Sequence, residues 1–229
     1  LDRSSAASDV YKRQGQGAAG ARRHPGAAVN RPARPAPRTA ARPASRRTPP
    51  GEVRLIGGLW KRSKLPVPDR PGLRPTPDRV KETLFNWLGQ DLGGWRVLDA
   101  FAGTGALGFE AASRGAAEVV LLERDPALAH SLEATRQRLG AGMARIERTD
   151  ALAWMARCAP GRFELVLLDP PFDAELAVPA TLVAAPLACN GGFVYLESGQ
   201  PLAEPPPGLV LYRHLKAGAV HAQLFRRQG

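Results

Sequence analysis

The sequence is poor in residues that define several common protein classes. Its 229 residues include two cysteines, Cys158 and Cys189, which form neither a CxxC pair nor a cluster with metal-ligand spacing. Two thiols cannot hold a cysteine-ligated iron–sulfur cluster, and so few are typical of a reducing compartment. No apolar run approaches the ~18 residues that a membrane span requires. We therefore expect a cytoplasmic protein without a membrane segment.

Histidine is nearly as scarce. The four histidines show no metal-ligand spacing, and they are His24, His130, His214 and His221. We expect these side chains at the surface and no bound metal ion.

Acidic residues are scarce in the first third of the chain. The net charge of +11 is made up of +9 over residues 1–51, −1 from Glu52, +6 over 54–81 and −3 over 82–229. Basic stretches attract polyanions because binding releases condensed counterions. We expect a nucleic-acid partner, although solubility alone would also explain the charge of 1–51.

The sequence divides into three parts. Residues 1–51 are rich in arginine and proline and poor in large apolar residues, which predicts a disordered leader. Residues 1–14 resemble a translated sequencing adaptor, and we expect them not to be native sequence. Residues 52–90 are expected to form a basic hairpin and a helix, and residues 91–229 the main α/β domain.

The hairpin is predicted from two short strand-like runs, Val53–Ile56 and Lys64–Val67. The turn between them carries Trp60 beside Lys61 and Arg62, which could stack on a base and neutralise phosphates. Packing of Trp60 against the domain is the alternative.

A helix should follow the hairpin. Thr76 can cap it and Gly89 suits its end. Its buried stripe is predicted to be Val80, Leu84, Trp87 and Leu88, with Arg79, Glu82 and Asn86 on another face.

Strands and helices alternate after Trp95. Strands are expected at 96–100, 118–123, 145–148, 163–169, 193–197, 209–215 and 220–226, with helices at 105–114, 126–139, 151–157 and 174–185. Near-continuous apolar strands are typical of a sheet buried on both faces. The last two strands lack a helical crossover, which predicts a mostly parallel seven-stranded sheet ending in an antiparallel hairpin.

A glycine turn follows the first of these strands. Gly103, Gly105 and Gly108 fit GxGxxG, so a dinucleotide-binding domain must be considered. However, Asp99 ends the strand, and its carboxylate would repel a pyrophosphate at this turn. S-adenosylmethionine carries an ammonium and a sulfonium instead. We therefore predict that cofactor, with Asp99, Phe101, Gly103 and Gly105 as contacts.

Two further acids end the next two strands. Glu123 can accept hydrogen bonds from both ribose hydroxyls, unless it is merely a solvated acid. Asp150 could receive the adenine amine or cap the helix that begins at Ala151.

The segment Asp169-Pro170-Pro171-Phe172 follows another apolar strand. A nucleobase amine is a poor nucleophile because its lone pair is delocalised into the ring. Asp169 and the carbonyl of Pro170 can accept its two N–H groups and favour attack, while Phe172 offers a stacking face. A rigid turn without catalytic function is the alternative reading of Asp-Pro.

Together with Arg54–Gly58 and Leu73–Leu88, these motifs resemble the RsmD-type 16S ribosomal RNA guanine-N2 methyltransferases. The resemblance implies an α/β fold of the class I S-adenosylmethionine-dependent methyltransferases, with a Rossmann-like sheet. It implies methyl transfer to guanine N2 in the RNA of the bacterial small ribosomal subunit, or of an assembling particle. It also places Arg74 and Thr76 near the methionine carboxylate of the cofactor.

The residues alone leave the target open. Asp169–Phe172 would serve adenine N6, cytosine N4, guanine N2 or a glutamine amide. Only 57 residues follow Phe172, which leaves no reading domain, so the basic stretch is the expected RNA-binding surface. Its predicted contacts are Arg54, Trp60, Lys61, Arg62, Lys64 and Arg79. Methylation of DNA adenine or of a protein amide, or a non-catalytic RNA-binding module, remain alternatives, and we expect a monomer.

Overall fold

The computed structural model describes residues 52–68, 78–171 and 175–229, which belong to one compact unit, Arg47–Gly229. The predictions for Arg74, Thr76 and Phe172 lie outside these residues. No helix among the described residues is long and apolar enough to span a bilayer.

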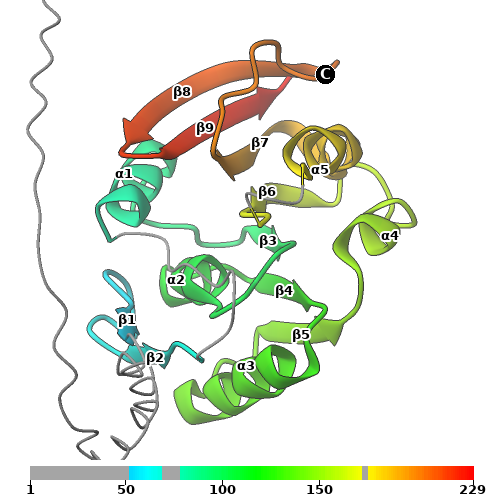
Figure 1. The fold of residues 1–229 in the computed structure, drawn as a ribbon. Coiled ribbons are helices and arrows are strands. Elements are labelled where there is room, and N and C mark those ends of the chain that lie inside the picture. Colours follow the sequence, from blue (N-terminus) through cyan, green and yellow to red (C-terminus); the bar gives the residue numbers. More distant parts are fainter. Residues whose placement is uncertain (1–51, 69–77, 172–174) are drawn as a thin grey trace, which may run out of the picture. The chain divides into compact units, whose positions relative to one another are not determined.

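A seven-stranded sheet forms the centre of the unit (Figure 1). Its strand order is β5-β4-β3-β6-β7-β9-β8, in which the first five strands are parallel and the last two antiparallel. The strands are β3 (Arg96–Asp99), β4 (Glu118–Glu123), β5 (Ala144–Arg148), β6 (Phe163–Leu168), β7 (Ala188–Ser198), β8 (Leu209–Ala217) and β9 (Val220–Arg227). The sequence prediction of a mostly parallel sheet ending in a hairpin is confirmed.

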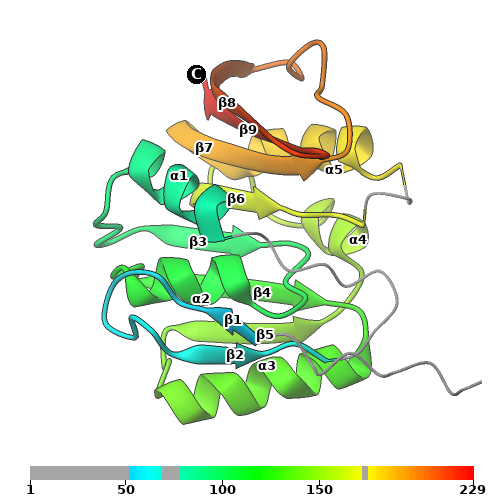
Figure 2. The same ribbon diagram turned by 60° about the vertical axis from the view of Figure 1, so that its left-hand side comes forward.

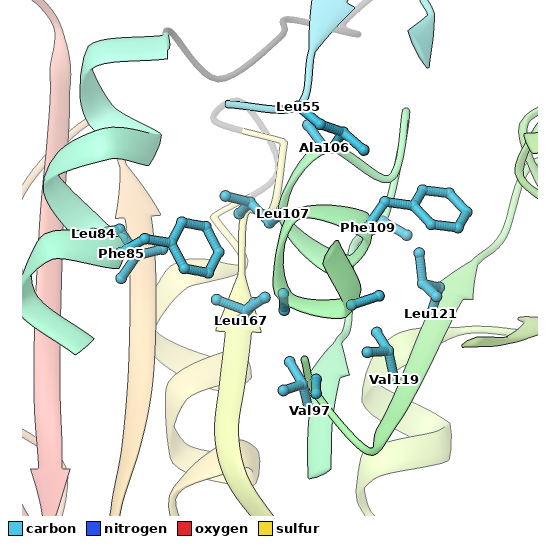
Figure 3. Close-up of a cluster of buried hydrophobic side chains, with 14 of the residues drawn as sticks. Leu55, Leu84, Phe85, Val97, Ala106, Leu107, Phe109, Val119, Leu121 and Leu167 are labelled. Atoms are coloured by element: carbon cyan, nitrogen blue, oxygen red, sulfur yellow. The ribbon is translucent and has the colours of Figure 1, made fainter. Parts of the chain in front are cut away.

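Helices cover both faces of the sheet (Figure 2). On one face lie α1 (Asp78–Leu88), α2 (Ala106–Ser113) and α3 (Pro126–Leu139), and on the other α4 (Ala151–Met155) and α5 (Ala177–Ala184), which runs into a 3-10 turn at Ala185–Leu187. Strand residues alternate between the two apolar clusters, since Val97 faces α2 and Leu98 faces away from it. Figure 3 shows the first cluster, in which Leu84 and Phe85 of α1 pack toward Leu167 of β6.

A short antiparallel hairpin, β1 (Glu52–Arg54) and β2 (Lys64–Pro66), lies along α2. Leu55 packs beside Ala106, at the start of α2 (Figure 3). The turn reaches the other end of the helix, where the Trp60 N–H donates to Ser113 Oγ at 2.9 Å. The hairpin therefore runs the length of α2, about 12 Å for eight residues.

Helix α1 departs from its predicted buried stripe. Val80 and Leu84 are buried as expected, whereas Trp87 and Leu88 are only partly buried. Phe85 and Lys81 are completely buried instead. The Lys81 ammonium can be buried because Nζ donates to the Arg54 carbonyl at 2.6 Å and pairs with Asp78 at 3.0 Å. This lysine ties the hairpin to α1.

The element boundaries differ from the prediction mainly near the carboxyl-terminal strands. Strand β7 begins at Ala188 rather than 193, and α5 spans Ala177–Ala184 rather than 174–185. His221, expected at the surface, is 9% exposed because β9 lies between β7 and β8. It stacks on the exposed His214.

Candidate active site at the carboxyl edge of the sheet

The glycine turn connects β3 to the first turn of α2. Gly103 and Gly105 have φ values of 53° and 77°, a region that glycine adopts without strain. Asp99, at the end of β3, is 1% exposed, and its Oδ2 accepts the N–H of Gly108 at 2.8 Å. A Cβ on Gly108 would lie 2.9 Å from that oxygen, so glycine permits the approach. Asp99 is thus bonded to the start of α2 rather than open to solvent.

Glu123 holds the same turn from the neighbouring strand. One carboxylate oxygen accepts the Gly103 N–H at 2.9 Å, and the other accepts the Asp125 N–H at 2.7 Å. Glu123 is therefore a structured, half-buried residue, not a solvated acid. Gly103 and Gly108 thus donate to carboxylates, so a pyrophosphate here would meet occupied donors and negative charge.

The electrostatics of this edge favour positive charge. Burial is the main factor that raises the pKa of Asp99 to about 7, and the charges of Asp169 and Glu123 raise it further. Hydrogen bonds from Gly108 and Phe101 act in the opposite direction. A cationic ligand beside these three acids would relieve their mutual repulsion.

Asp169 lies next to this site, on the adjoining strand. Strand β6 pairs with β3, and the Ala100 N–H donates to the Leu167 carbonyl at 3.0 Å, two residues before Asp169. The charge of Asp169 raises the pKa of Asp99 and also that of Tyr195 on β7. Because β6 lies between β3 and β7 in the sheet, Asp169 lies between the ends of these two strands, next to the glycine turn that follows β3.

A pocket of about 480 Å³ adjoins Asp169 on the β7 side. Pro170 and Glu197 line it, although Pro170 is buried and Glu197 is only 2% exposed. The lining continues through Pro171, Glu175–Val178 and Ser198–Leu202. The glycine turn and this pocket thus flank Asp169 on opposite sides.

The other predicted site residues have more ordinary surroundings. Asp150 is exposed and caps α4, because its Oδ1 accepts the Ala153 N–H at 2.9 Å. Its predicted contact with adenine stays a prediction. Phe101 is partly buried against the cluster on the α4 face. Among the described residues no group of three or more His, Cys, Asp and Glu side chains could hold a metal ion.

The predicted RNA-binding residues are distributed along the hairpin and α1. Five are exposed: Arg54, Lys61, Arg62, Lys64 and Arg79. Trp60 is partly buried against the core, which favours packing against the domain over stacking on a base. Lys61 lies in the hairpin turn, at the end of α2 remote from the glycine turn, whereas the Arg62 N–H donates to the Leu55 carbonyl at 2.8 Å. Arg54 and Lys64 form the pair of the β1–β2 ladder nearest the hairpin turn.

Sequence reasoning missed Glu197 and Tyr195. The Tyr195 hydroxyl donates to Glu197 Oε1 at 2.9 Å within β7. A signal was present, since Glu197 ends a predicted strand as Glu123 does. It was overlooked because no glycine turn or diproline follows it.

The fold and this edge define a class of protein. Five parallel strands, an antiparallel terminal hairpin, and an acid-bonded glycine turn beside Asp169-Pro170 make a Rossmann-like methyltransferase domain.

Comparison with known proteins identifies the family. Residues 53–226 match the family model described as Conserved hypothetical protein 95. A relative named Ribosomal RNA small subunit methyltransferase D, from Escherichia coli, is 41% identical over 78% of this chain and 91% of its own length. A protein of the same name from Haemophilus influenzae is 39% identical, over 77% and 94%. A solved Escherichia coli structure covers 78% of this chain and 99% of its own, with a TM-score of 0.69 and 39% identity. The chain belongs to this family, which confirms the resemblance to the RsmD-type enzymes.

Proposed function

We propose that the protein transfers a methyl group from S-adenosylmethionine to the exocyclic N2 of a guanine in bacterial 16S ribosomal RNA. The observation that carries this proposal is the position of Asp169-Pro170 between the acid-bonded glycine turn and the 480 Å³ pocket. That arrangement puts two hydrogen-bond acceptors where a cofactor and a planar base would meet.

The glycine turn fits the proposed cofactor. Asp99, Glu123 and Asp169 give this edge a negative field, which suits an ammonium and a sulfonium. The glycines allow the backbone to approach the methionine moiety, and Glu123 remains the predicted ribose contact. When bound, the cofactor supplies an electrophilic methyl group. Arg74 and Thr76, the predicted contacts of its carboxylate, stay predictions.

Asp169 and Pro170 would prepare the amine. Two acceptors hold its N–H groups, draw the nitrogen toward a pyramidal geometry and orient its lone pair. When the amine nitrogen takes the methyl group that the bound cofactor would supply, the Asp169 carboxylate would accept the surplus proton of the amine. This is one in-line displacement without a covalent enzyme intermediate. Phe172, as the predicted stacking face, completes the proposed catalytic set.

The RNA target rests on charge and relatives. Residues 54–81 carry +6, and the exposed basic residues of the hairpin belong to this stretch. Two relatives at about 40% identity bear names that specify small-subunit ribosomal RNA. We therefore infer that the partner is 16S RNA or an assembling small subunit.

The decisive experiment is transfer of labelled methyl to small subunits from an Escherichia coli strain that lacks its own family member. We expect N2-methylguanosine at one nucleotide of 16S RNA after nuclease digestion and mass spectrometry. DNA and total protein are offered in parallel. Label found in N6-methyladenine or in a protein amide, with none in guanosine, would overturn the proposal.

A further inference from the structure

The last two strands form a basic segment that the proposed transfer step does not use. Strand β9 lies beside β7, and β8 is the edge strand of the sheet. Residues 209–229, which contain both strands, include four lysines and arginines and no acidic residue. Residues 82–208, by contrast, hold more acids than bases. The terminal hairpin therefore differs in charge from the rest of the domain.

The strand register brings this charge to the pocket. Lys216 of β8 pairs with His221 of β9, and His221 pairs with Ser198 of β7. Directly paired residues of neighbouring strands point to the same face of a sheet, so these three side chains form one row. Ser198 ends β7 and lines the pocket. The row thus leads from the pocket rim to Lys216, about 10 Å away across two strand spacings.

The middle of the row is a stacked pair of histidines. The rings of His214 and His221 lie 5.3 Å apart, and His214 Nε2 is 3.1 Å from His221 Nδ1. Burial lowers the pKa of His221, and the neighbouring Lys216 and His214 lower it further. Among the described residues no ion pair joins Lys216 to a carboxylate. An anion beside Lys216 would relieve this accumulation of positive charge.

The same strands hold the wall of the pocket. Gln223 of β9 is 2% exposed; its Oε1 accepts the Leu202 N–H at 2.8 Å, and its Nε2 donates to the Leu202 carbonyl at 3.2 Å. Ser198 Oγ donates to the Gln200 carbonyl at 2.7 Å. Both Gln200 and Leu202 line the pocket. Because β9 carries both Gln223 and His221, the pocket wall and the row keep a fixed separation.

This arrangement suits a nucleotide whose base enters the pocket. The phosphates on either side of such a base stay outside, at the rim. Contacts to phosphates fix the position of a strand without reading its bases. A lysine ammonium is a compact charge with three rotatable donors, and Lys216 is exposed at the outer end of the row.

We propose that Lys216 binds a phosphate that adjoins the target nucleotide while the target base occupies the pocket. The stacked histidines form the floor between Lys216 and the pocket. The inference rests on the proposed function, since it names a further contact with the same RNA substrate.

The first test removes the charge. Lys216→Ala should raise KM for small subunits about fivefold at about 0.1 M salt, with kcat changed by less than about twofold. The slope of log kcat/KM against log salt should decrease in magnitude by about 0.7, the value for one phosphate of a single strand. Lys216→Arg keeps the charge and should stay within about twofold of wild type. An unchanged KM in Lys216→Ala would overturn the inference.

Arg213→Ala is the matched control. Arg213 is an exposed cation on the same strand, but it pairs with Leu224 of the apolar cluster beneath α1 and so lies on the opposite face. Its removal should change KM by less than about 1.5-fold and leave the salt dependence as in wild type. Equal effects of the two variants would mean that net charge alone matters, which would overturn the inference.

The second test locates the phosphate. Small subunits are reconstituted with 16S RNA that carries an uncharged methylphosphonate on the 5′ or the 3′ side of the mapped nucleotide. One of these should raise the KM of wild type about fivefold but that of Lys216→Ala less than twofold, because the variant has already lost the contact. Equal proportional effects in both proteins at both positions would overturn the inference. None of these results would contradict the proposed function, which fails only if wild-type enzyme does not methylate guanosine in unmodified small subunits.

Discussion

The two halves of the carboxyl edge contain the same residue types but use them differently. On β3 and β4, Asp99 and Glu123 accept backbone N–H groups at 2.7–2.9 Å and hold the glycine turn. On β6 and β7, Asp169 and Glu197 lie beside a pocket, and the Tyr195 hydroxyl donates to Glu197 at 2.9 Å. The first half fixes the backbone of the glycine turn, whereas the second half borders the pocket.

The chain that follows each strand explains this difference. After β3 and β4 the chain soon enters α2 and α3, whose first turns supply N–H donors to nearby acids. After β6 it enters Pro170 and Pro171, which have no N–H group. The diproline thus supplies no N–H group at the two positions directly after Asp169. If the comparison is right, changes in the two halves should alter different measured quantities.

The largest effect is expected from Asp169→Ala. Loss of an acceptor for the reacting amine should lower kcat by about 10³-fold. The Kd for S-adenosylmethionine should change by no more than about threefold, because the glycine turn is held by other acids. Turnover is followed with labelled cofactor, and binding by calorimetry. A variant that keeps wild-type turnover would remove the catalytic role of Asp169, whereas background methylation in both proteins would favour the non-catalytic binding-module alternative.

Asp99 should make stability depend on pH. Its folded-state pKa of about 7 exceeds its unfolded value of about 4. The native state therefore binds an extra proton between these values, and stability falls as pH rises through that window. From pH 5 to pH 8 we expect wild type to lose about 2.5 kcal/mol more than Asp99→Asn, in which the side chain is neutral throughout.

Urea unfolding at the two pH values measures this difference, because groups that do not interact with Asp99 contribute equally in the two proteins. Asparagine retains an oxygen that can accept the Gly108 N–H, so the variant should fold. Parallel pH dependence in both proteins would show that Asp99 ionises normally.

The sequence predicted the arrangement of the glycine turn better than that of β7. Apolar strands, a glycine turn and strand-terminal acids are local patterns, so the sequence indicated that Asp99, Gly103 and Glu123 lie close together. It did not indicate the burial of Glu197, which depends on β7 lying between β6 and β9, a long-range arrangement. Lys81 was missed for a similar reason, since its burial depends on the Arg54 carbonyl of a distant strand.

Glu123→Ala should weaken cofactor binding and leave kcat nearly unchanged, which is the reverse of the effect expected for Asp169→Ala. The turn loses the acceptor of two N–H groups, and the cofactor loses its predicted ribose contact. We expect the Kd for S-adenosylmethionine to rise about 20-fold, with kcat at saturating cofactor changed by less than about threefold.

The matched control is Glu118→Ala, at the other end of the same strand, where the acid pairs with Arg162. That change should leave the Kd within about twofold. Equal effects of the two changes would mean that Glu123 acts only through the stability of β4.

The smallest effect is expected for the hairpin. It tests whether the RNA-binding surface extends from the carboxyl edge of the sheet to the hairpin. Arg54 and Lys61 are both exposed, but they lie at different levels of α2. Lys61 follows Trp60, which bonds to Ser113 at the end of the helix, whereas Arg54 lies two residues before Ile56, whose N–H donates to Glu110 in the middle of the helix. If RNA approaches the carboxyl edge, Arg54→Ala should raise KM for small subunits about threefold at low salt, with Lys61→Ala below about 1.5-fold. Both effects should shrink as salt increases. A larger effect at Lys61 would instead place the RNA across the hairpin turn and the remote end of α2.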